Sequence, residues 1–411
     1  MAKDFSCVGS TECRLGEYIS IRTGRLDANA AETDGEYPFF TCAREISRIN
    51  SWAFDCECVL VAGNCTPHVS YYNGKFNAYQ RVYIIESNDP GRLSTKYLYY
   101  FFKEYMALAI DKQHGAIEKF FCLSDFTEIK ISLPDLPTQL RIAGILGSLD
   151  EKIELNRKKI AELEALAKTI YDYWFVQFDF PDKNGKPYKS SGGKMVWNEK
   201  LKREIPAGWE VKPLEKACKR IQSGGTPESN NEAFYSGDIP WFTTQELIDS
   251  WVFCSNRSIT KSALENSAAK LFPPDTVLLA IYAAPTVGRL AILAKESAFN
   301  QACCGFVVGD DISKEYLFLF LYENRNKLNS IADGTAQKNL SVGKMRMFDV
   351  LIPTGEIMTL WRNIAEPLFD AIRTDSETAH ILSRQRDALL PLLMNKQVSV
   401  GELKLTSTGN L

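Results

Sequence analysis

Two stretches of the chain repeat apolar residues at heptad spacing, with charged residues between them. The first covers residues 137–178, opens with Pro137 and has no glycine after Gly147; the second covers residues 355–396. This pattern predicts two long helices that pair through an apolar seam. The predicted seam consists of Leu149, Ile153, Asn156, Ile160 and Leu163 in the first helix and of Leu368, Ile372, Asp375, Ala379 and Leu382 in the second.

One seam position is polar in both helices: Asn156 in the first and Asp375 in the second, with Arg386 as a basic exception further along. In an antiparallel pair, Asn156 and Asp375 would both lie near the middle. We hypothesise that they meet and fix the register at some cost in stability. Two ordinary bundle helices are the alternative. The sustained heptad spacing favours helices that pair with each other.

The other residues alternate short β-rich runs with turns and some helix. Residues 58–62 and 276–280 are continuous apolar runs between turn signals, which indicates buried strands. Pro134 and Pro353 each end an apolar run shortly before a long helix. Each half of the chain therefore reads as a mixed domain followed by a long helix.

The two halves resemble each other in sequence. Tyr97, Lys119 and Pro134 each have a counterpart 219 residues later, in Tyr316, Lys338 and Pro353. Three separate matches in one register indicate a duplication. Further upstream, residues 37–41 resemble 239–243 and Phe76-Asn77 resembles Phe299-Asn300 at other offsets, as surface loops of unequal length would produce.

The sequence therefore predicts an α+β fold. It has two tandem α/β domains separated by two long antiparallel coiled-coil helices, with an internal pseudo-two-fold repeat. The expected boundaries are 1–136 for the first domain, 137–178 for the central helix, 179–198 for a linker, 199–354 for the second domain, 355–396 for the C-terminal helix and 397–411 for a tail.

Composition indicates a cytoplasmic globular protein. The apolar and charged fractions, 45% and 24%, are ordinary for such a protein. No apolar run is long enough to span a membrane, and the N-terminal residues lack an apolar signal segment. The 11 cysteines are irregularly spaced, which favours reduced thiols. The net charge of −3 is low for a protein that binds DNA by itself, so such a role needs a local basic patch or a partner.

A search for catalytic chemistry gives little. Phosphate-binding loops, dinucleotide fingerprints and the short motif of amino-methyltransferases are absent from the sequence. Asp182 and Glu210 are too loosely spaced for a nuclease site. Zinc is conceivable at a group consisting of Cys56, Cys58, Cys65 and His68, but Cys58 reads as core strand and the second copy lacks matching cysteines. We therefore expect no catalytic residue, no metal site and no cofactor.

The chain resembles the specificity subunits of type I restriction–modification systems over nearly its whole length. The resemblance depends on the duplication, on the segment Leu201–Val211 with its Ile-Pro-Ala-Gly-Trp run, on the Gly-Thr-Ala-Gln-Lys-Asn loop at 334–339 and on the heptad helices. The first domain lacks the Pro-x-Gly-Trp opening and begins nearer Arg14. Its N-terminal boundary is therefore open.

This resemblance implies two target recognition domains, each of which reads one half of a bipartite, asymmetric site in double-stranded DNA. The helices would set the spacer and dock two methyltransferase subunits, which bind S-adenosylmethionine and methylate adenine. Motor–nuclease subunits would complete a restriction enzyme. The specificity subunit itself holds no catalytic residue, and no membrane is involved.

Polar residues on loops beside the matched strands are the candidates for DNA contacts. In the first domain these are Thr41, Arg44, Asn64, His68, Lys75, Gln80, Arg81 and Lys119, and in the second Thr243, Thr244, Gln245, Tyr282, Arg289, Gln301, Thr335, Gln337 and Lys338. For each, a solvated side chain or a loop-stabilising hydrogen bond is the alternative. Lys119 and Lys338 share the 219 offset, which suits phosphate contacts better than base reading.

Two other classes of function compete with DNA recognition. One is a scaffold that carries two interaction modules on a coiled coil, which exposed aromatic patches at the domain tips would favour. The other is a self-contained nuclease or methyltransferase, against which the missing motifs argue.

Overall fold

The computed structural model describes residues 12–62, 68–111, 122–282, 286–332 and 339–398. The chain divides into two compact units. The first unit consists of residues 1–154 and 380–411, and the second of residues 155–379. Each unit contains one globular domain together with one end of each long helix, so both helices contribute to both units.

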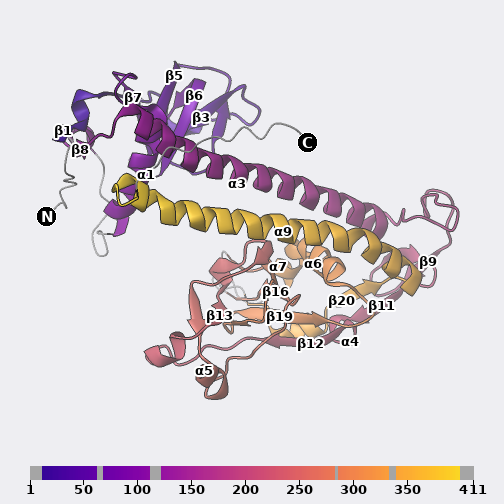
Figure 1. Ribbon diagram of the computed structural model, residues 1–411. Coiled ribbons are helices and arrows are strands. Elements are labelled where there is room, and N and C mark those ends of the chain that lie inside the picture. Colours follow the sequence, from indigo (N-terminus) through magenta and orange to yellow (C-terminus); the bar gives the residue numbers. More distant parts are fainter. Residues whose placement is uncertain (1–11, 63–67, 112–121, 283–285, 333–338, 399–411) are drawn as a thin grey trace, which may run out of the picture. The chain divides into compact units, whose positions relative to one another are not determined.

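The two long helices are α3 (Leu136–Tyr171) and α9 (Gly355–Met394). In the first unit, the Arg386 guanidinium on α9 lies 2.7 Å from the Asp150 carboxylate on α3. In the second unit, Lys159 pairs with Asp375 at 2.8 Å, and the rings of Tyr171 and Trp361 lie 6.0 Å apart. Because later positions on α3 contact earlier positions on α9, the helices run antiparallel, as predicted (Figure 1).

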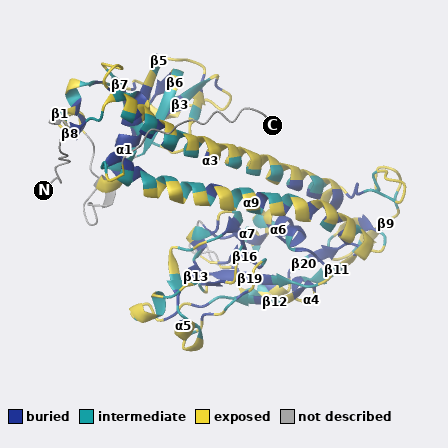
Figure 2. Ribbon diagram, in the orientation of Figure 1, coloured by how far each residue is buried: buried dark blue, intermediate teal, exposed yellow. Residues whose placement is uncertain are grey.

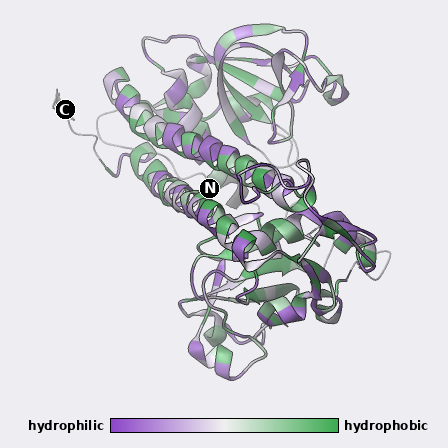
Figure 3. Cartoon of the chain, turned by 90° about the vertical axis from the view of Figure 1, so that its right-hand side faces the viewer, coloured by the Kyte–Doolittle hydropathy of each residue, from purple (hydrophilic) through white to green (hydrophobic). Residues whose placement is uncertain are grey.

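The predicted seam is the less exposed face of both helices. Ile153, Ile372 and Ala379 are buried, and the other seven predicted seam residues are partly buried. Both helices carry hydrophobic and hydrophilic bands along their length (Figure 3). Asp375, whose side chain is 14% exposed, pairs with Lys159 rather than with the predicted Asn156. Arg386, the basic exception, is matched across the seam by Asp150.

The first domain is built on a six-stranded sheet with the order β2-β7-β5-β6-β3-β4. These strands are β2 (Ile19–Thr23), β3 (Tyr37–Phe40), β4 (Ser47–Ile49), β5 (Phe54–Ala62), β6 (Val69–Ala78) and β7 (Val82–Ser87). A small sheet pairs β1 (Glu12–Arg14) with β8 (Lys130–Ser132). The helices α1 (Thr95–Asp111) and α2 (Leu123–Thr127) pack with Leu146 of α3 and Leu390 of α9 in one apolar core.

The second domain spreads the same elements over several sheets. The largest has the order β12-β19-β16-β17-β14, and a second has the order β15-β13-β18. Their strands are β12 (Cys218–Ser223), β13 (Ile239–Phe242), β14 (Ser250–Val252), β15 (Arg257–Ile259), β16 (Val277–Ala280), β17 (Leu290–Leu293), β18 (Ala298–Phe299) and β19 (Cys303–Val308). Two-stranded sheets pair β9 (Met195–Asn198) with β10 (Arg203–Pro206), and β11 (Glu210–Pro213) with β20 (Asp349–Ile352).

The second domain also contains the short helices α4 (Leu214–Ala217), α5 (Lys261–Glu265), α7 (Arg325–Ile331) and α8 (Val342–Arg346), and the longer α6 (Lys314–Glu323). Its core includes Trp361 of α9, Phe175, Trp209 and Tyr316 of α6. The buried residues along the helices therefore continue into the domain (Figure 2). Burying aromatic side chains of this size is the main stabilising contribution.

The hydrogen bonds confirm the duplication. Ser94 caps α1 by accepting from the Tyr97 amide at 3.4 Å, and Ser313 caps α6 by accepting from the Tyr316 amide at 3.2 Å. Leu15 donates to the Ile129 carbonyl at 2.9 Å, and Leu214 donates to the Phe348 carbonyl at 2.9 Å. Ser94, Tyr97 and Ile129 keep the 219 offset to their counterparts, whereas Leu15 and Leu214, at the start of each domain, are 199 residues apart. Strand β1 also gives the first domain the equivalent of β11.

We expect Arg386→Ala to lower the free energy of unfolding by about 1–3 kcal/mol, because it removes the nearer of two cations from the partly buried Asp150 carboxylate and leaves only Lys103, at 3.9 Å. Chemical denaturation followed by circular dichroism measures this. Arg384 is exposed on the same helix, so Arg384→Ala should change stability by no more than about 0.5 kcal/mol. Equal effects of the two substitutions would contradict the role given to the Arg386–Asp150 pair.

Candidate nucleic-acid interface

In the first domain, two parallel strands end side by side. Strands β3 and β6 pair Phe40 with Ala78, and the Tyr79 amide donates to the Phe40 carbonyl at 2.9 Å. Thr41 and Gln80 therefore leave the sheet at the same edge. Parallel strands bring their carboxyl ends to one edge, which is a common place for recognition residues.

Ala62, the last residue of β5, joins this edge to a further loop. Its amide donates to the His68 carbonyl at 3.0 Å, and Ala62 pairs with Val82, which directly follows Arg81. The chain turns back tightly here, because the Val82 amide donates to the Tyr79 carbonyl at 2.9 Å. We call Thr41, His68, Gln80 and Arg81 the first edge cluster.

The second domain repeats this hydrogen-bonding pattern. The Asn300 amide donates to the Phe242 carbonyl at 2.9 Å, and the Ala280 amide donates to the Arg289 carbonyl at 2.8 Å. Ala280 also pairs with Cys303, whose amide donates to Asn300 at 3.1 Å. The second edge cluster is therefore Thr243, Arg289 and Gln301. Its members correspond to Thr41, His68 and Gln80.

The structure corrects one match between the halves. The pair equivalent to Phe299-Asn300 is Ala78-Tyr79 and not Phe76-Asn77, because Tyr79 and Asn300 make the equivalent bond to the neighbouring strand. The sequence match was wrong by two residues. Repeated Phe-Asn dipeptides are too short to define a register, whereas backbone hydrogen bonds define it uniquely.

Sequence reasoning missed part of this edge. Ile21 pairs with Ile85 of β7, and Ile221 pairs with Phe306 of β19 at the equivalent place. Ile21 is followed two residues later by Thr23 and then by Gly24. Ile221 is followed in the same way by Ser223 and Gly224. This second repeat, at an offset of 200, could have been found. It brings the exposed Arg25 to the first cluster, where the Arg25 amide donates to the Ala78 carbonyl at 3.2 Å. At the equivalent place Gly225 donates to the Phe299 carbonyl, and the next residue, Thr226, donates to the Gln301 side chain.

The two glycines are required by close backbone packing. A Cβ atom at Gly24 would overlap the carbonyl oxygens of Ala78 and Tyr79, and one at Gly224 would overlap the Phe299 carbonyl oxygen. No rotation of a side chain relieves an overlap with backbone. The glycines therefore let β2 and β12 approach the strand ends that carry the clusters.

Several predicted contact residues have structural partners. Thr41 accepts from the Ala43 amide at 3.2 Å, and Thr243 forms a capping box with Glu246 at 2.8 Å. Thr244 is buried, whereas Arg44 and Gln245 are exposed on neighbouring turns.

Lys75 lies apart from the strand ends that define the clusters. Lys75 pairs with Asp55 at the start of β5 and stacks on Trp52, with its ammonium 4.6 Å from the ring centroid. Tyr282 instead follows Ala280 by two residues, and its carbonyl accepts from the Thr286 hydroxyl at 3.4 Å on the turn that leads to Arg289. Tyr282 bridges to Asn339. Five predicted contact residues lie outside the described residues, namely Asn64, Lys119, Thr335, Gln337 and Lys338.

The possible zinc group receives no support from the residues that can be placed. Burial raises the pKa of the Cys58 thiol, which disfavours the thiolate that zinc requires. Cys65 lies outside the described residues, and the described part of the chain holds no group of three metal-ligating side chains.

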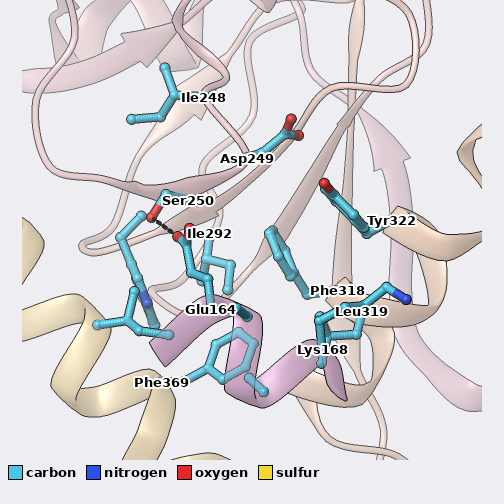
Figure 4. Close-up of a pocket in the computed structure, with 14 residues that line it drawn as sticks. Glu164, Lys168, Ile248, Asp249, Ser250, Ile292, Phe318, Leu319, Tyr322 and Phe369 are labelled. Carbon is cyan, nitrogen blue, oxygen red and sulfur yellow. Dashed lines mark hydrogen bonds between the residues drawn. The ribbon is translucent and has the colours of Figure 1, made fainter. Parts of the chain in front are cut away.

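The second unit contains a cavity of about 280 Å³ between α3, α9, α6 and β14 (Figure 4). Its lining is mostly apolar, with Trp251, Phe318 and Phe369 among its residues, and it includes no histidine or cysteine. At its rim the Ser250 hydroxyl donates to the Glu164 carboxylate at 3.3 Å. The cavity therefore lies where the domain packs against the helix pair.

The linker after α3 carries a local basic patch. Lys183, Lys186, Lys189 and Lys194 are exposed, and residues 183–194 include no acidic side chain. Within the described residues, none of the four lysines makes an ion pair. The net charge of −3 for the whole chain does not reveal this patch.

Comparison with known proteins gives consistent matches. A family model described as "Type I restriction modification DNA specificity domain" matches residues 8–165 and 206–384. The type I restriction enzyme EcoDI specificity subunit of Escherichia coli is 41% identical over 154 residues, which are 38% of this chain and 34% of that relative. The MjaIX specificity subunit of Methanocaldococcus jannaschii is 27% identical over 319 residues, 75% of this chain and 70% of the relative.

Among solved structures, the crystal structure of a type I restriction–modification S subunit from M. genitalium has a TM-score of 0.61 at 16% identity. The match covers 94% of this chain and 97% of that one, which shows a shared fold. Within the described residues, no helix is long and apolar enough to cross a membrane.

We expect Gly224→Ala to lower the free energy of unfolding by about 1–3 kcal/mol, because the added methyl group forces β12 away from the Phe299 carbonyl. Thermal and chemical unfolding measure the loss. At Gly355, which begins α9, a Cβ atom would meet open space, so Gly355→Ala should be neutral or slightly stabilising. A neutral Gly224→Ala would show that the close approach is not required.

Proposed function

The chain belongs to the family of type I restriction–modification DNA specificity subunits, and on that premise we propose that each domain reads one half of a bipartite, asymmetric DNA site through its edge cluster. The single observation that carries this proposal is the repeated hydrogen-bonded edge around Ala62 and Ala280. The same backbone arrangement presents polar side chains in both domains, and some of these side chains differ between the two edge clusters.

The side chains in the clusters suit base reading. Glutamine pairs with adenine, and arginine pairs with guanine, through two parallel hydrogen bonds in the major groove. Gln80 and Gln301 are exposed, and Arg289 is partly exposed. Because the net charge is −3, we propose that partner subunits supply most of the phosphate contacts and that this chain supplies discrimination.

We further propose that the two helices set the spacer and dock two methyltransferase subunits, with motor–nuclease subunits completing a restriction enzyme. In the second unit, α3 carries two large exposed apolar residues, Leu155 at 66% and Leu166 at 47% exposure, and Tyr173, 39% exposed, follows in the π-helical turn Asp172–Val176. A spacing of 11 residues places Leu155 and Leu166 on one helix face. An exposed apolar stripe of this kind is typical of a protein interface.

Catalysis is assigned to the partners. S-adenosylmethionine would bind to the methyltransferase subunits, and this chain would contribute no reacting group. The scaffold alternative is not favoured, because the exposed residues of both edge clusters are polar.

Methylation mapping tests the function directly. The chain is co-expressed with a type I methyltransferase subunit from the same organism in a host lacking adenine methylation, and modified adenines are located by sequencing. We expect a motif in two parts with an unread spacer. The proposal would be overturned if methylation occurred at a continuous motif. It would also be overturned if adenine methylation did not exceed the level produced by the methyltransferase without this chain.

We expect Leu166→Glu to weaken association with the methyltransferase at least about tenfold, because it places a charge on the apolar stripe. Analytical ultracentrifugation of the mixed subunits measures this. Ala161 is also exposed on α3, on another face of the helix, so Ala161→Glu is the matched control. Equal association by both variants would place the methyltransferase elsewhere.

A further inference from the structure

The shared backbone frame allows the two edge clusters to be compared position by position. Thr41 corresponds to Thr243, and Gln80 corresponds to Gln301, so these positions are identical in the two domains. A residue that is the same in both domains cannot by itself distinguish two different half-sites. The domains differ at two positions. His68 corresponds to Arg289, and Arg81 corresponds to Ala302, because Ala62 pairs with the following Val82 and Ala280 pairs with the following Cys303.

The equivalence of His68 and Arg289 rests on two independent sets of bonds. Each residue's carbonyl accepts from the alanine that ends the preceding strand, at 3.0 Å for Ala62 and 2.8 Å for Ala280. The following residues also pair in the same register, Val69 with Val61 and Leu290 with Leu279. Both side chains therefore start from the same point on the edge.

Arg289 is held on a tight turn. Its amide donates to the Thr286 carbonyl at 3.0 Å, and the preceding Gly288 has a positive φ of 89°. Residues with a side chain rarely adopt this conformation. The position of Arg289 on the edge is therefore fixed by its backbone, as a reading residue requires.

Among the described residues, no carboxylate pairs with the guanidinium of Arg289. Its neighbour Arg325, whose Cγ lies 2.9 Å from a Cβ position at Gly288, behaves differently. Arg325 pairs with Asp249 and packs over the Tyr322 ring at 4.8 Å. Arg325 therefore stabilises the fold, whereas the guanidinium of Arg289 keeps its N–H donors available for a ligand.

We propose that Arg289 specifies a guanine in the half-site read by the second domain, and that position 68 has the corresponding role in the first. The guanidinium fork matches the O6 and N7 acceptors of guanine with two parallel hydrogen bonds. Histidine at position 68 is shorter and lacks the guanidinium fork, so the same place on the edge cannot make the same two-bond contact. This inference rests on the proposed function.

The decisive variant is Arg289→Lys, because lysine retains the positive charge but not the bidentate fork. It is co-expressed with the methyltransferase, and methylated adenines are mapped. We expect the second domain's half-site to lose its preference for guanine at one position by about 5- to 150-fold. The first half-site and the spacer should stay unchanged. Arg384→Lys, on the exposed face of α9, should leave the whole motif intact.

His68→Arg is the reciprocal variant. It should alter one position of the first half-site and leave the second half-site as it was. An unchanged motif in Arg289→Lys, with weaker methylation of the same motif in Arg289→Ala, would overturn the inference and identify Arg289 as a phosphate contact. A change in both half-sites would overturn it as well.

The wild-type chain separates this inference from the proposed function. If wild type gives a motif in two parts and the Arg289 variants leave it unchanged, only the role of Arg289 fails. If wild type gives no such motif, the proposed function itself fails.

Discussion

The antiparallel pairing of α3 and α9 is the constraint on which both units depend. In each domain the largest apolar core includes residues of both helices, while smaller clusters lie within the domain itself. In the first unit, Leu146 and Leu390 complete the core formed by α1 and α2, and in the second, Trp361 packs among Phe175 and Tyr316. Each domain is thus anchored to both helices at once, which restricts how its strand ends can be presented.

The duplicated edge shows how one fold can carry two specificities. Backbone hydrogen bonds around Ala62 and Ala280 place the side chains, and Gly24 and Gly224 allow the strands to approach. None of these interactions depends on what the reading side chain is. A substitution at position 68 or 289 can therefore change recognition while the frame is retained, provided that the new side chain fits.

Local sequence signals predicted the secondary-structure elements better than they predicted the contacts between side chains. Heptad spacing predicted both long helices, because burial of one face repeats along the whole helix. It did not predict that Asp375 pairs with Lys159, since the partner of a charged side chain depends on how the two helices rotate against each other. Likewise, the Phe-Asn dipeptides suggested a register that was wrong by two residues.

The sequence by itself determined the duplication, the two helices and the absence of recognisable catalytic motifs, because periodicity and spacing are properties of the chain alone. It also named Thr41, His68, Gln80, Thr243, Arg289 and Gln301 as candidates, but only as separate positions. The tertiary structure decided that they form two equivalent clusters. That grouping arises from hydrogen bonds between strands distant in sequence, such as Tyr79 with Phe40 and Asn300 with Phe242, and no local pattern encodes such bonds.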